Sequence, residues 1–185
     1  MIDFKNIKRI NVVGTSGSGK STVSRALAEK LNLPYIELDA LFWKPDWEES
    51  SDEEFQEKLR NALNQEGWVL DGNYHSKTVH IKWQDVQLIV WVDYSFVRTL
   101  VQAFGRAIRR ASSGEELWDG TGNRETFSGT FFNRDSVLLW TITSYHNVKK
   151  RYETLYNPDR KLPYQLIRLR SHAETRRFLD QLPVL

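Results

Sequence analysis

Short apolar runs alternate along this chain with longer segments in which apolar residues recur every three or four positions. Runs of about four to eight apolar residues bounded by turn residues are typical of buried strands, whereas the longer repeat is typical of amphipathic helices. Five runs predict strands at about residues 7–13, 35–38, 68–70, 87–92 and 165–169. Strands that alternate with helices predict a parallel sheet covered by helices on both faces.

The helical repeats follow recognisable start signals. Val23, Leu27 and Leu31 recur at intervals of four and predict a helix over residues 20–31. Ser50 and Ser51 each precede a glutamate by three positions, so either residue is able to form the capping box of the next helix. Further repeats predict helices behind residue 95, from about residue 135 to 156, and behind residue 171.

Two stretches interrupt this alternation. Residues 41–50, LFWKPDWEES, follow no apolar repeat and are predicted to be irregular. Residues 111–134 carry four of the chain's ten glycines and little periodicity. Because this glycine-rich stretch separates two strong helical repeats, we expect it to form a long insertion between helices.

The sequence GTSGSGKST carries the strongest chemical signal. It fits the pattern G-x-x-x-x-G-K-[ST], with an apolar run before it and a helical repeat after it. Its glycines permit backbone angles that a Cβ would forbid, so that backbone N–H groups and the helix N-terminus face phosphate oxygens. In such a loop, Lys20 binds the β- and γ-phosphates and the Ser21 hydroxyl binds Mg²⁺. The predicted nucleoside triphosphate site consists of Gly14, Thr15, Ser16, Gly17, Ser18, Gly19, Lys20, Ser21 and Thr22.

Aspartates follow three of the other predicted strands. Ligands of open parallel sheets gather at the carboxyl ends of strands, so we expect Asp39, Asp71, Asp93 and the phosphate loop on one rim. Asp71 and Asp93 each end an apolar run, and either carboxylate suits Mg²⁺, which prefers oxygen ligands. Asp93 stands directly before a predicted helix, so a turn or capping role is an alternative there. The apolar periodicity does not indicate which of these two aspartates binds Mg²⁺.

Composition narrows the class of protein. The 185 residues contain no cysteine, which excludes disulfides and thiolate metal sites. No apolar run reaches the length of a membrane span, and the N-terminus lacks a signal-peptide pattern, so we expect a cytoplasmic protein. Eleven acidic and three basic residues lie between Glu37 and Asp71, whereas nine basic and three acidic residues lie between Lys149 and Arg177. No groove-reading or base-stacking motif accompanies the basic segment, which disfavours nucleic acid as a partner.

Taken in order along the chain, these motifs resemble the adenylate-kinase-like family of small P-loop kinases. The phosphate loop, the DGNY sequence at Asp71, the glycine-rich insertion with Arg124 and the last strand–helix pair follow the family's order. Within that family, IELDALFW, WVLDGNY and the GNRE sequence resemble bacterial topology-modulation (FlaR-like) proteins.

The resemblance implies a single domain, residues 1–185, with the three-layer P-loop NTPase fold and a five-stranded parallel sheet of order 2-3-1-4-5. It implies an acceptor-binding region over residues 39–66 and a lid over residues 111–134. The strand beside the phosphate-loop strand would then end at Asp71, which favours Asp71 over Asp93 for Mg²⁺, together with Ser21.

One departure from the family concerns the phosphate acceptor. Adenylate kinases carry an arginine soon after the Asp-Gly pair, whereas this chain has Asn73, Tyr74 and His75. That difference argues against a mononucleotide acceptor. A site containing Asp39, near Phe42 and Trp43, is more similar to those of shikimate- or gluconate-type kinases, which phosphorylate a hydroxyl.

Phosphoryl transfer depends on positioning and on neutralising charge. Lys20 and Mg²⁺ supply part of the positive charge, and mobile arginines supply the rest. Arg124 is the first candidate because glycines flank it, and Arg106 and Arg110 follow at the root of the lid. Asp39 is the candidate for accepting the proton of an acceptor hydroxyl.

The sequence therefore favours a magnesium- and ATP-dependent kinase of a small molecule, either a nucleotide or a hydroxyl-bearing metabolite. The alternative is a nucleotide-binding regulatory protein, acting on DNA topology or on a protein partner, with little kinase turnover. A kinase needs its lid arginines over the phosphates, whereas a switch needs only an ordered loop.

Overall fold

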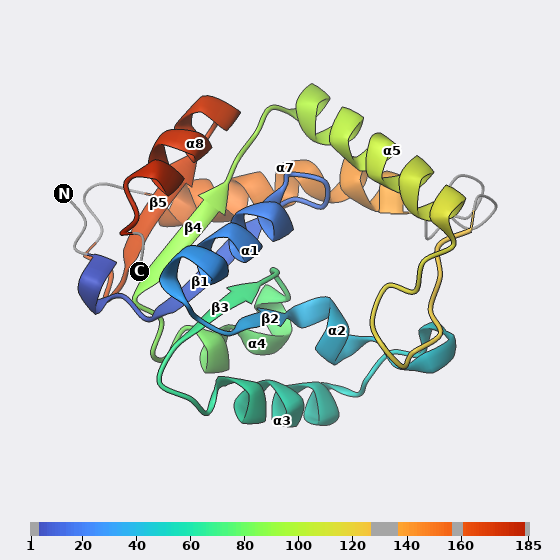
Figure 1. Cartoon of the computed structure of the whole chain (residues 1–185), viewed down its shortest axis with the longest axis horizontal. Helices are drawn as coiled ribbons and strands as arrows, with labels where there is room; N and C mark the ends of the chain where they lie inside the picture. The colour runs from blue at the N-terminus through green and yellow to red at the C-terminus, as the bar shows by residue number, and fades with distance from the viewer. Residues whose placement is uncertain (1–3, 127–136, 157–160, 184–185) are drawn as a thin grey trace.

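The predicted five-stranded parallel sheet is present. The computed structural model describes residues 4–126, 137–156 and 161–183. Its strands are β1 (Arg9–Gly14), β2 (Tyr35–Glu37), β3 (Trp68–Asp71), β4 (Leu88–Val92) and β5 (Gln165–Leu169). All pairs are parallel and the order is β2-β3-β1-β4-β5, which confirms the predicted order (Figure 1).

Helices connect the strands and cover the sheet. The longer ones are α1 (Lys20–Leu31), α3 (Asp52–Leu63), α5 (Phe96–Ser113), α7 (Val137–Leu155) and α8 (His172–Asp180). The shorter ones are η1 (Phe4–Asn6), α2 (Leu38–Phe42), η2 (Pro45–Trp47) and α4 (His75–Lys82). Among the described helices, none is long and apolar enough to cross a membrane.

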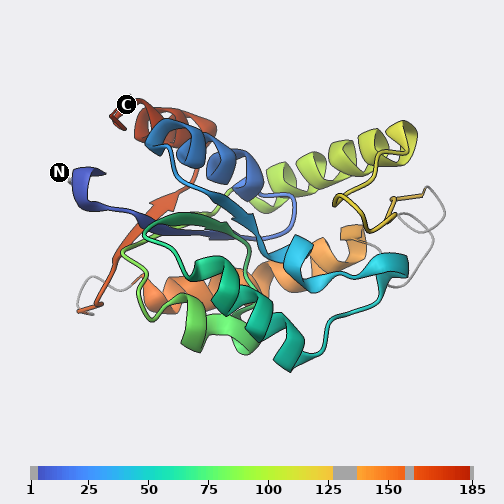
Figure 2. The same ribbon diagram turned by 60° about the horizontal axis from the view of Figure 1, so that its bottom comes forward.

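The sheet is the middle of three layers (Figure 2). Helices α1 and α8 cover one face, and α3, α4 and α7 cover the other. Strand β1 contributes to both cores, because Ile10 and Val12 face α1 whereas Val13 packs on the opposite side. This two-sided burial explains why the strand sequences are nearly continuous apolar runs.

Two short helices occupy the stretch predicted to be irregular. Helix α2 begins directly after β2, and η2 follows two residues after α2 ends. Phe42 anchors α2 because its buried ring packs on Phe55 and Tyr74. The prediction missed these helices because each spans less than two turns and cannot show a 3.6-residue repeat.

Of the two possible capping boxes, the structure selects Ser51. Its hydroxyl accepts a hydrogen bond from the Glu54 backbone N–H at 3.2 Å, and the Glu54 carboxylate accepts one from the Ser51 N–H at 2.9 Å. These reciprocal bonds fix the start of α3. The described part of helix α7 spans Val137–Leu155, within the predicted range, and residues 127–134 of the predicted lid lie outside the described residues.

Helix α5 carries its apolar stripe on the outside. Val101 is 66% exposed and Phe104 is 48% exposed, whereas the buried residues of the helix are Thr99, Ala103 and Ala107. The predicted helix is confirmed, but several of its large apolar side chains are exposed, whereas Phe96 packs on the buried Tyr145 of α7. The buried face is made of small residues because α5 packs closely against the phosphate loop.

Candidate active site

The phosphate loop links the end of β1 to the start of α1. An added Cβ at Gly17 would lie 2.7 Å from the Ala103 Cβ and 2.8 Å from the Thr99 carbonyl oxygen, and Gly17 has a φ of +79°. Glycine is therefore required both by the backbone angle and by the close approach of α5. Gly14 is enclosed similarly, because a Cβ there would lie 2.6 Å from the Val92 carbonyl oxygen.

The start of α1 has the features of an anion site. Gly19 is its N-cap residue, makes no side-chain capping bond, and is followed by no acidic residue in the first turn. The first N–H groups of a helix have no partner within the helix, so they favour a bound anion. Ser18 is 1% exposed and its hydroxyl has no hydrogen-bond partner among the described residues. Lys20 and Ser21 lie in the first turn, as predicted.

Asn73 holds the loop from the neighbouring strand end. Its Nδ2 donates to the Gly14 carbonyl at 2.6 Å, and the Gly14 N–H donates to Asn73 Oδ1 at 3.1 Å. Tyr152 on α7 donates its hydroxyl to the same Oδ1 at 3.2 Å. This role of Asn73 was not predicted from the sequence. The adjacency of β3 and β1 was available, but not the side-chain direction of a residue in the loop.

A lysine is buried beneath this loop. Lys82, the last residue of α4, is fully buried and donates from Nζ to the carbonyl oxygens of Asn73 and Gly72. Burial, and then the charge of Arg151, lower the pKa of Lys82 to about 7. The loop that carries Asn73 therefore depends on a group that titrates near neutral pH.

Asp71 ends β3, beside β1, and is 2% exposed. Its Oδ2 accepts a hydrogen bond from the Tyr35 hydroxyl at 3.0 Å, while its buried Oδ1 has no partner among the described residues. An unpartnered buried carboxylate oxygen fits a Mg²⁺ ligand or a water bound to the ion. No group of three or more His, Cys, Asp or Glu residues suited to a metal occurs in the described part of the chain.

Asp93 has a different role. Its Oδ2 accepts hydrogen bonds from Arg168 Nε at 2.8 Å and from Arg168 Nη2 at 2.5 Å. Arg168 also lies over the Trp91 ring, 4.4 Å from its centroid. This ion pair joins the end of β4 to β5. Of the two aspartates, Asp71 is the one with a fully buried oxygen that has no partner among the described residues, which fits the choice implied by the family resemblance.

Two further carboxylates lie nearby: Glu37 ends β2, and Asp39 lies in α2. Asp39 Oδ1 accepts from the Tyr74 hydroxyl at 2.8 Å. Glu37 Oε2 accepts from the Tyr35 hydroxyl at 3.1 Å, and Tyr35 also binds Asp71. Burial, followed by the nearby carboxylate charges, raises the pKa of Tyr35 and of Tyr74. Both hydroxyls therefore stay protonated and act as hydrogen-bond donors.

The arginines at the root of the lid and in the lid have different hydrogen-bond partners. Arg106 Nη2 donates to the Ser16 hydroxyl at 2.9 Å, which places this guanidinium at the loop. Burial lowers the pKa of Arg106, and the charges of Asp39 and Asp71 oppose that effect. Arg110 pairs instead with Glu125 at 3.0 Å. Arg124, the first candidate from sequence, is exposed and donates from Nη1 to the Gly114 carbonyl at 2.7 Å.

The described part of the lid, residues 114–126, lies against the predicted acceptor region rather than standing free (Figure 1). Asn123 is 1% exposed. Its Nδ2 donates to the Lys44 carbonyl at 2.8 Å, and its Oδ1 accepts from the Trp47 N–H at 3.0 Å. Trp118 donates from Nε1 to Glu37 Oε1 at 3.3 Å. Asn123 and Trp118 therefore tie this segment to residues 37–47.

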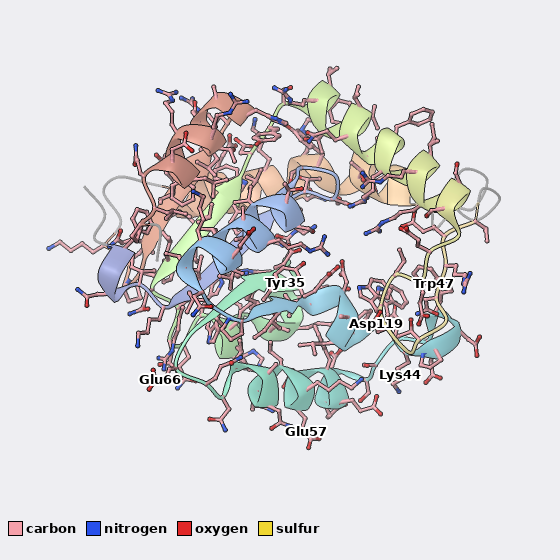
Figure 3. All side chains as sticks on the ribbon, viewed as in Figure 1. Tyr35, Lys44, Trp47, Glu57, Glu66 and Asp119 are labelled. Carbon is pink, nitrogen blue, oxygen red and sulfur yellow. The ribbon has the colours of Figure 1, made fainter. Side chains whose placement is uncertain are left out.

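Trp118 begins a row of three tryptophans whose rings contact one another. The Trp118 and Trp47 ring centroids are 5.9 Å apart, and those of Trp47 and Trp43 are 5.7 Å apart. Figure 3 shows Trp47 beneath the lid loop. Phe42, which the family resemblance places near the acceptor site, is a buried core side chain. Trp43 is half-buried beside it.

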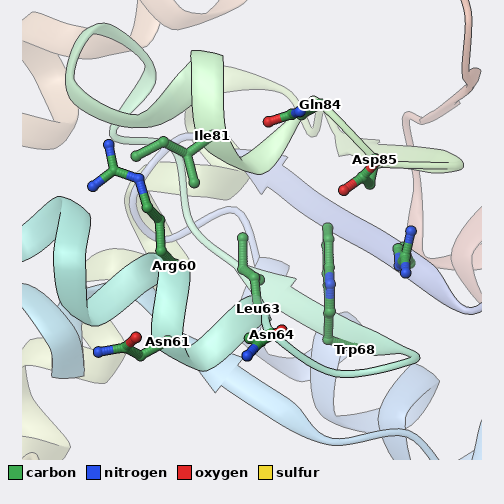
Figure 4. A pocket seen from close by; sticks show the side chains of 9 residues that line it. Arg60, Asn61, Leu63, Asn64, Trp68, Ile81, Gln84 and Asp85 are labelled. Carbon is green, nitrogen blue, oxygen red and sulfur yellow. The ribbon is translucent and has the colours of Figure 1, made fainter.

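A separate pocket lies at the N-terminal ends of the strands, on the side of the sheet away from the phosphate loop. It has a volume of about 370 Å³ and lies between the C-terminal ends of α3 and α4 (Figure 4). Arg9 and Trp68, which line it, begin β1 and β3, whereas the phosphate loop follows the other end of β1. This pocket is therefore not part of the candidate active site.

Comparisons with known proteins agree with this geometry. Residues 10–92 match the family model described as an AAA domain. Over 106 residues the chain is 35% identical to a shikimate kinase of Sulfurihydrogenibium sp., covering 48% of this chain and 62% of that protein. Over 68 residues it is 37% identical to an adenylate kinase of Mesomycoplasma hyopneumoniae, covering 37% of this chain and 31% of that protein. The matched stretches thus span less than two thirds of either relative.

A solved structure extends the likeness over the whole fold. The shikimate kinase from Acinetobacter baumannii, in complex with shikimate, has a TM-score of 0.54 at 17% identity, covering 96% of this chain and 92% of that chain. The fold is that of P-loop kinases. The matched sequence relatives are small-molecule kinases. The resemblance to topology-modulation proteins stays a prediction.

Proposed function

We propose that this chain is an ATP-dependent kinase that transfers the γ-phosphoryl group to a hydroxyl of a small molecule. One observation carries the proposal: the phosphate loop opens onto the rim that holds Asp71, and Arg106 reaches that loop from the root of the lid. The positive elements and the carboxylates that phosphoryl transfer requires therefore converge on one place.

Each group has a role in this proposal. The α1 N-terminus and Lys20 bind the phosphates, and Asp71 Oδ1 with the Ser21 hydroxyl would hold Mg²⁺. Bound with ATP, the ion neutralises phosphate charge. The acceptor oxygen bonds to the γ-phosphorus while the bond from that phosphorus to the β,γ-bridging oxygen breaks. ADP leaves with the electron pair, and Asp39 takes the hydroxyl proton. The lid, which includes Arg124, excludes water.

Turnover of ATP tests the proposal. Purified protein should bind a fluorescent ATP analogue and, without an acceptor, release ADP slowly, because water then takes the place of the acceptor. Lys20→Ala should abolish ADP release and weaken binding of the analogue, whereas Lys30→Ala, at the other end of α1, should change neither. Equal binding by Lys20→Ala and the unsubstituted protein would contradict the proposed occupancy of the loop.

Whether turnover follows binding separates the two function classes. Stimulation of ADP release by a small-molecule acceptor supports the kinase. Tight ATP binding with no release under any acceptor would instead favour the nucleotide-binding regulatory protein.

A further inference from the structure

The space proposed for the acceptor is bordered by acids and aromatic rings. We name the acceptor compartment as Glu37, Asp39, Asp71, Tyr74 and Trp118. The Tyr74 hydroxyl binds Asp39, and Trp118 Nε1 binds Glu37, so the two loops that carry these rings meet the carboxylates directly. Asp71 adds a buried oxygen that has no described partner.

These carboxylates lie near one another and near the phosphate loop. Tyr35 donates to Glu37 and to Asp71 at 3.1 and 3.0 Å, so the two acids share one donor. The charges of Asp39 and Asp71 both act on the pKa of Arg106, which is bonded to the phosphate loop. An acceptor placed for transfer would therefore meet Glu37 and Asp39, with Asp71 beside them at the proposed magnesium site.

The basic residues of the surrounding segment bind other groups. Residues 37–71 contain three basic residues. Lys44 pairs with Glu54 at 2.7 Å and with Glu48 at 3.3 Å. Lys58 donates to the Ser50 hydroxyl and the Leu41 carbonyl, and Arg60 is exposed and bonded to Gln56.

Three cations on neighbouring elements are also paired or bonded. Lys77 on α4 pairs with Asp52 at 2.8 Å. Arg25 lies 3.5 Å from Glu37, but its side chain is 63% exposed, so its charge is weakly felt. Arg106 is bonded to Ser16 and serves the phosphates. A carboxylate or phosphate on the acceptor would thus face like charges, which disfavour its binding.

We infer that the acceptor is a polyhydroxylated ring that is uncharged or carries an amine, and that the compartment excludes acceptors bearing a carboxylate or phosphate. Carboxylates accept hydrogen bonds and donate none, so they suit hydroxyl and ammonium donors. The indole of Trp118 offers a face to a ring or to an ammonium group. This inference rests on the proposed function and specifies its substrate class.

Matched pairs of compounds test the inference. The pairs are methyl shikimate with shikimate, cytidine with cytidine monophosphate, and glucose with glucose 6-phosphate; glucosamine adds an amine. Tryptophan fluorescence would report binding, and ADP release would report turnover, with the full chain and saturating magnesium and ATP. At least one uncharged or amine compound should bind, and its anionic partner should bind about tenfold or more weakly.

Two variants add a second readout. Glu37→Gln should reduce the discrimination against the anionic member of a pair, because it removes one compartment charge. Glu57→Gln, on the exposed face of α3, should leave discrimination unchanged (Figure 3). If the anionic members bind as well as their partners, or if no uncharged or amine compound binds, the inference is wrong. Loss of ATP-analogue binding would instead contradict the proposed function itself.

Discussion

The side-chain amide of Asn73 pairs with the backbone of Gly14 through both of its polar atoms. The 2.6 Å bond to the Gly14 carbonyl and the 3.1 Å bond from the Gly14 N–H reproduce the exchange that a neighbouring strand would make. Strand β3 ends at Asp71, so Asn73 continues the support of the first loop glycine beyond the last strand residue. The geometry of the phosphate loop therefore depends on the segment that also presents Asp71.

Removing this amide should loosen the phosphate loop. Asn73→Ala leaves two backbone groups of Gly14 without partners, which costs about 1–3 kcal/mol each when the groups are buried. We expect ATP affinity to fall about tenfold or more. Calorimetric titration measures this, with Asn61→Ala on α3 as the control, which should bind normally. Unchanged affinity of Asn73→Ala would show that the loop holds its shape without the clamp.

Asp71 and Asp93 should fail in different ways when each is replaced by asparagine. Asp71→Asn removes the charge proposed to hold Mg²⁺, so magnesium-dependent ADP release should fall while the fold persists. Asp93→Asn weakens the ion pair with Arg168 and should lower the free energy of unfolding by about 3 kcal/mol. Urea unfolding and ADP release separate these effects. Greater loss of turnover in Asp93→Asn would reverse the assignment of the two residues.

The sheet and the phosphate loop were predictable because their signals are local. Residues 14–22 match a fixed pattern, and the bounds of α1 agree with the predicted range of 20–31. The choice of Asp71 needed more, because it depends on which strand lies beside β1. Strand order is set by long-range pairing, and it came here from the family resemblance. The structure confirms that order.

Contacts between segments far apart in the chain could not be predicted from the sequence. The stripe of α5 predicted a helix, but Val101 and Phe104 are exposed because Gly17 admits only small α5 residues, such as Ala103, at the contact. Arg124 was preferred for its glycine neighbours, yet those neighbours do not determine where a long side chain points. Hydrogen bonds such as Trp118 to Glu37 join residues 81 positions apart, and no local pattern encodes them.

Arg106 and Arg124 should affect different kinetic constants. Arg106 lies at the phosphate loop in the described conformation, so Arg106→Ala should weaken ATP binding as well as turnover. Arg124 would have to leave Gly114 to reach the γ-phosphate, so Arg124→Ala should lower kcat, by about two orders of magnitude or more, with little change in ATP affinity. Single-turnover kinetics with the fluorescent analogue distinguish the two. An Arg124→Ala variant with normal kcat would confine Arg124 to a structural role in the lid.

Asn123 should control the opening of the lid. It is the buried link between residues 114–126 and the segment at Lys44 and Trp47. Asn123→Ala should raise amide hydrogen exchange across residues 114–126, because segments with fewer buried contacts open more readily. A metal-fluoride complex with ADP should protect this segment in the unsubstituted protein. Asn64→Ala, an exposed substitution at the end of α3, should leave lid exchange unchanged. Equal exchange in all three proteins would identify the segment as a rigid insertion.

The buried Lys82 should make stability depend on pH. Its pKa is about 7 in the folded protein and about 10.4 in an unfolded chain. Between these values the unfolded chain binds the additional proton, so the free energy of unfolding should rise with pH from about 7 to about 10. Below pH 7 both states are protonated and this contribution is constant, with the cost of burying the charge fully present.

The matched comparison is Lys82→Met, which keeps a long side chain but removes the titrating group. Urea unfolding at pH 7, 8 and 9 would measure the difference in unfolding free energy between the two proteins. The unsubstituted protein should gain stability relative to Lys82→Met across this range, because only its unfolded chain binds an additional proton at residue 82. Other titrating groups, such as Tyr35 and Tyr74, are common to both proteins and cancel from the difference. If the difference does not change with pH, Lys82 keeps its ordinary pKa and is charged within the core at neutral pH.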